Sequence, residues 1–125
     1  MKLVSTEKAP SAAGPYSQAV VSGGFVFVSG QLGIDKSGIF GKDVAAQTEN
    51  ALENIREILL AAGSSLDKVV KTTCFLASIA DFPVFNEVYG RYFTARPARS
   101  LIEAAALPKG SLVEIEAIAE IDKEE

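Results

Sequence analysis

The chain has 125 residues, of which 48% are hydrophobic and 22% charged, a balance typical of one compact domain. It contains no histidine and one cysteine, Cys74, which excludes zinc sites of the Cys/His type, an internal disulfide and triads that use histidine as the base. The net charge of −4 and the scattered basic residues do not favour a nucleic-acid partner.

The first predicted structure is a β-hairpin. Residues 16–21 and 25–29 favour strand, and Ser22-Gly23-Gly24 between them supplies the positive φ angles of a tight turn. Ser29-Gly30-Gln31 is expected to end the second strand. The backbone there is open to a ligand, because Gly30 has no side chain to obstruct it.

A helix is predicted next, followed by a third strand. Apolar residues recur at spacings of three and four from Val44 to Ala62, with Asp43 as the expected cap and Gly63 as the end. The charged residues on the opposite side indicate a solvated face and no site. Val69 to Leu76 is rich in β-formers. One side of that strand is expected to carry Val70, Thr72, Cys74 and Leu76.

A second helix is expected to begin at Asp81, because Phe82-Pro83 fits a first helical turn. Its aromatic stripe indicates packing against a core. Asn86 lies on the same side, where a polar group needs partners. It is expected either to structure a neighbouring loop or to touch a ligand.

Two strands are predicted in the last third, separated by a turn at residues 107–111. In the first, Arg99 and Leu101 share one face, and Arg99 is expected to project alone beside its apolar neighbour. In the second, one face is apolar and the other carries Glu114 and Glu116 among Leu and Ile residues. A face both apolar and acidic suits a subunit interface or a lined cleft.

These elements predict one domain over residues 1–125, an α+β two-layer sandwich with a mixed β-sheet and two helices on one face. The other face is half apolar, so we expect subunits to associate through it. No apolar run approaches the ~20 residues of a spanning helix and the first residues lack a secretory signal, which predicts a cytoplasmic protein without a membrane partner. Residues 123–125 are expected to form a solvated tail.

Four motifs in order resemble the RidA/YjgF family of enamine/imine deaminases. They are AGPYSQAV at 13–20, VSGQLG at 28–33, VVKTTCFL at 69–76, and PARS at 97–100 with ALPKGSLVEIEAIA at 106–119. The resemblance spans nearly the whole chain. It implies a fold similar to trimeric bacterial chorismate mutase and a homotrimer with a cleft at each subunit boundary. It also implies cofactor-free hydrolysis of imines and enamines, derived from 2-aminoacrylate and 2-aminocrotonate, to 2-oxo acids and ammonia.

The same resemblance suggests roles for individual residues. Arg99 matches the arginine that holds the substrate carboxylate, and Glu114 the glutamate that orients water. Tyr16 matches an aromatic residue of the cleft, and Ser29 with Gly30 the strand end that meets the ligand. The sequence departs from the family at Leu101, which is bulkier than the usual residue and is expected to narrow the pocket, and at Arg96, in a short link before the PARS motif.

The chemistry also follows from the residue types. A 2-imino acid carries a carboxylate beside an electrophilic C=N carbon, so a site needs one fixed cation and one group that orients water. Arginine suits the first role because its planar fork meets a carboxylate with two parallel hydrogen bonds, and glutamate suits the second as a proton acceptor. Structural roles remain open for each candidate, and spacing alone does not separate Glu114 from Glu116 or Glu120.

Two other functions remain open at this point. The first is a carboxylate-binding regulatory trimer without turnover, which crowding by Leu101 would favour. The second is an RNA-directed translation inhibitor or ribonuclease, as some family members have been described, against which the acidic charge and the lack of histidine weigh.

Overall fold

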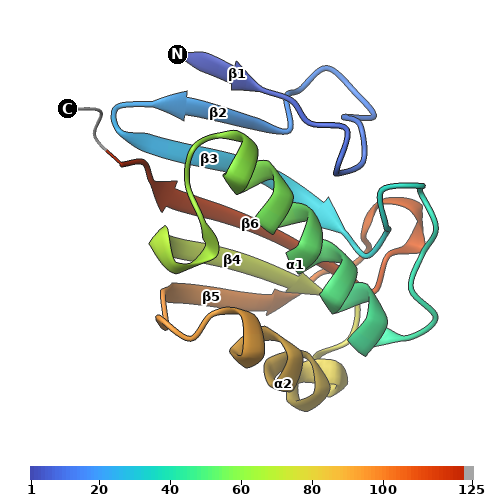
Figure 1. Ribbon diagram of the computed structural model, residues 1–125. Coiled ribbons are helices and arrows are strands. Elements are labelled where there is room, and N and C mark those ends of the chain that lie inside the picture. Colours follow the sequence, from blue (N-terminus) through green and yellow to red (C-terminus); the bar gives the residue numbers. More distant parts are fainter. Residues whose placement is uncertain (123–125) are drawn as a thin grey trace.

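The structure is a computed structural model, which describes residues 1–122 (Figure 1). The expected tail at 123–125 lies outside the described residues. The strands are β1 (Lys2–Val4), β2 (Ala19–Ser22), β3 (Phe25–Leu32), β4 (Val69–Leu76), β5 (Ala98–Glu103) and β6 (Val113–Glu120). The helices are α1 (Val44–Ala61) and α2 (Phe82–Tyr92), with short 3-10 turns at Leu66–Lys68, Ile79–Asp81 and Pro108–Gly110.

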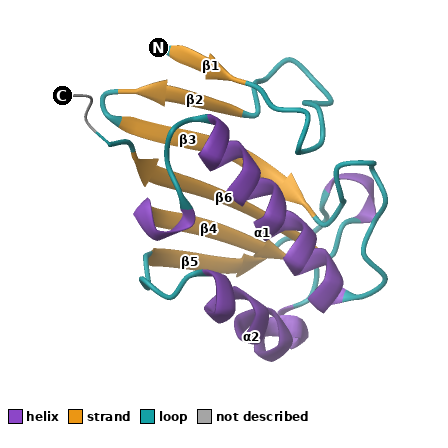
Figure 2. Ribbon diagram, viewed as in Figure 1, coloured by secondary structure: helices purple, strands orange, loops and turns teal. Residues whose placement is uncertain are grey.

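The strands form one mixed sheet in the order β1-β2-β3-β6-β4-β5. Strands β4 and β5 are parallel and all other neighbours are antiparallel. Both helices lie against the same face of the sheet (Figure 2), which confirms the predicted α+β arrangement. No helix within residues 1–122 has the length and apolar character needed to cross a bilayer.

The predicted helix boundaries are confirmed. The Asp43 carboxylate accepts a hydrogen bond from the Ala46 amide, 2.9 Å away, and so caps the start of α1. Gly63 ends this helix with a φ of +85°, a conformation that glycine adopts without steric cost. The middle of the apolar stripe of α1, including Leu52 and Ile55, is fully buried against the sheet, and its ends at Val44 and Ala62 are partly buried. Helix α2 begins after Asp81 as expected.

Two predictions about the hairpin strands are wrong at their ends. Strand β2 begins at Ala19, not at Tyr16, because the Tyr16 amide donates to the Gly14 carbonyl in a tight turn. Strand β3 does not stop at Ser29-Gly30-Gln31 and continues to Leu32. It does so through a β-bulge, since β3 advances three residues from Val28 to Gln31 while β6 advances two.

A second irregularity changes one face of β4. The register between β4 and β6 shifts between Val69 and Lys71. Val69 is therefore buried and Val70 is exposed, so Val70 does not share a face with Thr72, Cys74 and Leu76 as predicted. The rest of the predicted alternation in β4 is confirmed.

The face of the sheet opposite the helices is apolar over much of its area. Phe25 and Phe27 of β3, which alternate with buried Val26 and Val28, are 38% and 44% exposed there. Ile102 of β5 is 51% exposed. Glu114 and Glu116 of β6 alternate with buried core residues and so point to this open face. The mixed acidic and apolar face predicted from the sequence is present.

Candidate functional site

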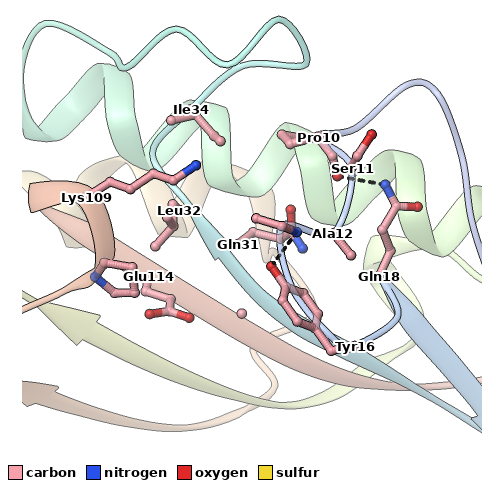
Figure 3. Close-up of a pocket in the computed structure, with 13 residues that line it drawn as sticks. Pro10, Ser11, Ala12, Tyr16, Gln18, Gln31, Leu32, Ile34, Lys109 and Glu114 are labelled. Carbon is pink, nitrogen blue, oxygen red and sulfur yellow. Dashed lines mark hydrogen bonds between the residues drawn. The ribbon is translucent and has the colours of Figure 1, made fainter.

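A pocket opens at the end of the sheet where the β3 bulge meets β6 (Figure 3). Its volume is about 140 Å³. The walls come from the loop before β2, the end of β3, the 3-10 turn at Pro108–Gly110 and the start of β6. The lining residues are Pro10, Ser11, Ala12, Ala13, Tyr16, Gln18, Gly30, Gln31, Leu32, Ile34, Pro108, Lys109 and Glu114.

The Glu114 carboxylate lies directly over the backbone of Gly30. A Cβ atom at residue 30 would lie 2.0 Å from Glu114 Oε2 and 2.9 Å from its Cδ. Only glycine leaves room for the carboxylate in this position. The bulge of β3 at Ser29-Gly30 thus provides the space that the side chain of Glu114, on the neighbouring strand β6, occupies.

The surroundings of Glu114 make its charged form less favourable than it is in water. Partial burial raises the pKa of the Glu114 carboxyl, and the charge of Glu116, on the same face two residues away, raises it further. A carboxyl whose pKa moves toward neutrality exchanges a proton with water or substrate more readily near physiological pH. The geometry distinguishes the two glutamates, because Glu114 lines the pocket and Glu116 does not.

Tyr16 forms part of the pocket wall, and its side chain is held in place. Its hydroxyl accepts a hydrogen bond from the Ala13 amide, 3.2 Å away, within the Pro- and Ala-rich loop. Tyr16 remains 52% exposed, so it is accessible to a ligand in the pocket. Figure 3 shows Tyr16 and Glu114 on the same side of the pocket.

Within residues 1–122, the residues that line the pocket do not include Ser29. Its hydroxyl donates to the Ser17 carbonyl, 2.6 Å away, and its amide donates to the Gln18 carbonyl, 2.9 Å away. These bonds tie the bulge to the chain that leads from Tyr16 into β2. A contact between Ser29 and a ligand stays a prediction.

Arg99 belongs to a second group of side chains, on the helix side of β5. Arg99 Nη1 donates to Asn86 Oδ1 of α2, 2.7 Å away. The Arg99 guanidinium carbon lies 4.8 Å from the Tyr89 ring centroid and 5.6 Å from that of Phe82. The prediction that Arg99 projects alone is therefore wrong, because α2 brings a polar and an aromatic partner to it.

The other two predicted binding residues are part of this second group. Asn86 is the hydrogen-bond acceptor just described, so its side-chain partner is Arg99. Leu101 shares the Arg99 face of β5 and packs against the core beside Cys74, its partner in β4. Burial raises the pKa of the Cys74 thiol to about 11, which keeps the thiol protonated and unreactive.

The two groups lie on opposite faces of the sheet within one chain. Arg99 pairs in register with Thr72, whose side chain is buried under α2, whereas Glu114 pairs with Phe75, three residues further along β4 and so on the other face. Strand β4 also separates β5 from β6. One chain therefore does not offer Arg99 and Glu114 to the same small ligand.

The sequence did not single out two residues of these groups. Lys109 lines the pocket from the 3-10 turn with a φ of +56°, unusual for a residue other than glycine. The preceding Pro108 and the following Gly110 signal a turn, but no pattern places the turn beside β3. Tyr89 belongs to the aromatic stripe of the second helix, for which only packing against a core was predicted, and its contact with Arg99 depends on how α2 crosses the sheet.

The residues near the pocket also bear on bound metals. Within residues 1–122 there is no group of three or more Cys, Asp or Glu side chains that could hold a metal ion. The pocket contains one carboxylate and one ammonium group among walls of mixed polarity. This arrangement suits a small organic ligand better than a hydrated cation.

Comparisons with known proteins cover almost the whole chain. The family model described as Endoribonuclease L-PSP matches residues 6–121. A Homo sapiens protein named 2-iminobutanoate/2-iminopropanoate deaminase is 50% identical over 121 residues, covering 94% of this chain and 88% of the human one.

Solved structures of the same fold are also similar in sequence. A putative endoribonuclease from Thermotoga maritima matches with a TM-score of 0.94 and 49% identity, over 98% of this chain and 99% of that one. The structure of E. coli TdcF with bound serine matches with a TM-score of 0.94 and 40% identity, over 98% of this chain and 100% of TdcF.

Proposed function

The chain belongs to the Endoribonuclease L-PSP family, the RidA/YjgF family that its motifs resemble, and from this premise we propose that it hydrolyses 2-imino acids to 2-oxo acids and ammonia. The substrates would be the imines and enamines that derive from 2-aminoacrylate and 2-aminocrotonate. The reaction would need no cofactor and would take place in the cytoplasm.

One observation carries this proposal: the Glu114 carboxylate, with its raised pKa, lies over the backbone of Gly30 in a small pocket with walls of mixed polarity. Such a carboxylate can hold one water molecule and accept its proton. The name of the human relative supports an imine as the molecule that this water attacks.

The proposed reaction needs only one side chain for proton transfer, which first accepts a proton and later donates it. Glu114 takes a proton from water while the water oxygen bonds to C2. The C=N π electrons move to the nitrogen, which takes a proton from solvent. The resulting carbinolamine loses ammonia when Glu114 returns its proton to nitrogen and the C–N bond breaks. The oxygen lone pair closes the C=O bond of the 2-oxo acid and releases the hydroxyl proton.

Arg99 would hold the substrate carboxylate. Among the ion pairs formed by residues 1–122, none involves Arg99, so its charge is not already matched by a carboxylate. Asn86 occupies one donor and leaves others for two parallel bonds to an anion. The serine bound to E. coli TdcF shows that a relative accepts a small molecule carrying a carboxylate.

A complete site would need two subunits. Since Arg99 and Glu114 lie on opposite faces of one sheet, we propose that a neighbouring subunit brings its Arg99 to the Glu114 pocket in a homotrimer. The exposed Phe25, Phe27 and Ile102 on the open face support association, because this apolar area would otherwise remain in water.

The remaining predicted residues would shape the cleft. Tyr16 and Gly30 would contact the ligand from the pocket side, with Ser29 holding the bulge between them. Asn86 and Leu101 would border the carboxylate end beside Arg99. Because Leu101 packs into the core, we expect it to limit substrate size without blocking the attacking water.

One experiment tests this function against the alternatives. 2-Iminobutanoate is generated in situ from threonine by a threonine dehydratase, and the release of 2-oxobutanoate and ammonia is followed with and without the protein. Faster release supports the proposal. Binding of 2-oxobutanoate without faster release would favour a non-catalytic carboxylate-binding trimer, and cleavage of RNA without either would favour the ribonuclease reading.

A further inference from the structure

The ring of Tyr89 packs against the guanidinium of Arg99. The guanidinium carbon lies 4.8 Å from the centre of the Tyr89 ring, within the range of a cation–π contact. The ring itself has little freedom, since it is only 8% exposed and lies between Phe85 and Phe93, with centroid distances of 5.6 and 4.7 Å. The aromatic cluster of α2 thus ends at the arginine.

The Tyr89 hydroxyl ties this ring to the sheet. It shares a hydrogen bond of 2.7 Å with the hydroxyl of Thr72, which is fully buried. Thr72 is the residue of β4 that pairs in register with Arg99 of β5. The backbone of Arg99 and the Tyr89 ring that contacts its guanidinium are therefore both connected to Thr72 of β4.

A ring below the guanidinium plane affects a ligand differently from an acidic partner. A cation–π contact attracts the guanidinium to the ring face without pairing its charge with a carboxylate, and the ring accepts no conventional hydrogen bond from the in-plane N–H donors. Of these donors, Nη1 is bonded to Asn86, and no carboxylate of residues 1–122 pairs with the group. The orientation is fixed while the positive charge stays available.

We infer that Tyr89 is a positioning residue for the carboxylate end of the substrate, acting through the orientation of Arg99. This inference rests on the proposed function, in which Arg99 holds a carboxylate. It assigns the effect to the ring and not to the hydroxyl, which serves to fix the ring. Thr72 and Asn86 then act on the same guanidinium from the strand and from the helix.

The test compares two substitutions at one position with a matched control. Tyr89→Leu removes the ring, and Tyr89→Phe keeps it and removes the bond to Thr72. The control Tyr92→Phe removes another phenol of α2, which is bonded instead to Glu53 of α1. For each folded variant, the dissociation constant for 2-oxobutanoate is measured by titration calorimetry or NMR, and KM and kcat by the dehydratase-coupled assay. Melting temperature is recorded in parallel.

Tyr89→Leu is expected to weaken 2-oxobutanoate binding by about 10-fold and to raise KM by a similar factor with little change in kcat. Tyr89→Phe should stay within roughly 3-fold of wild type in both quantities, since the ring remains. Tyr92→Phe should match wild type. A purely structural role would instead lower the melting temperature and the fraction of active protein, leaving KM and the dissociation constant of the folded molecules unchanged.

A folded Tyr89→Leu variant that binds 2-oxobutanoate as wild type does would overturn the inference, as would a wild-type protein that binds no 2-oxobutanoate. If Tyr89→Leu does not fold, Phe82→Leu removes the second ring, 5.6 Å from the guanidinium carbon and only half-buried. A weaker loss of binding is expected for Phe82→Leu, and unchanged binding would count against the inference. A wild-type protein that binds 2-oxobutanoate without hydrolysing the imine would contradict the proposed function alone.

Discussion

Replacing Gly30 with alanine should displace the Glu114 carboxylate and remove most activity. The added Cβ would lie 2.0 Å from Oε2, 2.9 Å from Cδ and 3.1 Å from Cγ, so the whole end of the side chain must move. Restoring ordinary contact needs a shift of about 1 Å or more, and a misplacement of that size at a reacting group costs about 100-fold in rate. Gly30 is not among the residues with positive φ, so its backbone accommodates alanine.

The assay is dehydratase-coupled release of 2-oxobutanoate, with thermal unfolding of the same sample. Gly90→Ala is the matched control, because a Cβ there meets nothing within 4 Å. This control should keep wild-type activity and gain roughly 0.5 to 1 kcal/mol of stability from replacing glycine in a helix. A folded Gly30→Ala protein with wild-type turnover would refute the claim that the position of Glu114 matters.

Four further outcomes follow from the same account. Arg99→Ala should lower kcat/KM by roughly 30-fold to several thousand-fold without unfolding the protein, since it leaves the substrate carboxylate unpaired, and undiminished activity would contradict its role as anchor. Glu114→Gln should lower turnover more than Glu116→Gln. Because the pKa of Glu114 is raised in the folded state, its charge opposes folding above that pKa. Glu114→Gln should therefore raise the melting temperature at pH 7, a gain that disappears below about pH 4, where the unfolded glutamate is also protonated. Light scattering should show a trimer at micromolar concentration, and a stable monomer would contradict the proposed intersubunit site.

Local sequence signals predicted most of the fold. The hairpin follows from Gly23 and Gly24, which adopt positive φ angles at its turn, and the first helix from the capping of its N-terminus by Asp43. Both signals act over a few residues of chain. The continuation of β3 past Ser29 was missed, because the bulge is stabilised by pairing with β6, over 80 residues away.

The candidate site was predicted less completely, for a related reason. Alternation along β6 correctly placed Glu114 on the open face, and the resemblance separated it from Glu116. Neither could show that Arg99 rests on Tyr89, because the contact joins a strand to a helix whose crossing angle no local pattern encodes. The position of Lys109 beside the pocket likewise depends on where the 3-10 turn meets β3.

The central claim, that each site combines Glu114 of one subunit with Arg99 of its neighbour, is tested most directly by mixing two inactive variants. Arg99→Ala and Glu114→Gln proteins are unfolded together in equal amounts, refolded and assayed for imine hydrolysis. In randomly mixed trimers, roughly a quarter of the interfaces receive both intact residues, so activity should return to about a quarter of wild type. No recovery in trimers shown by mass spectrometry to be mixed would contradict a site shared between subunits.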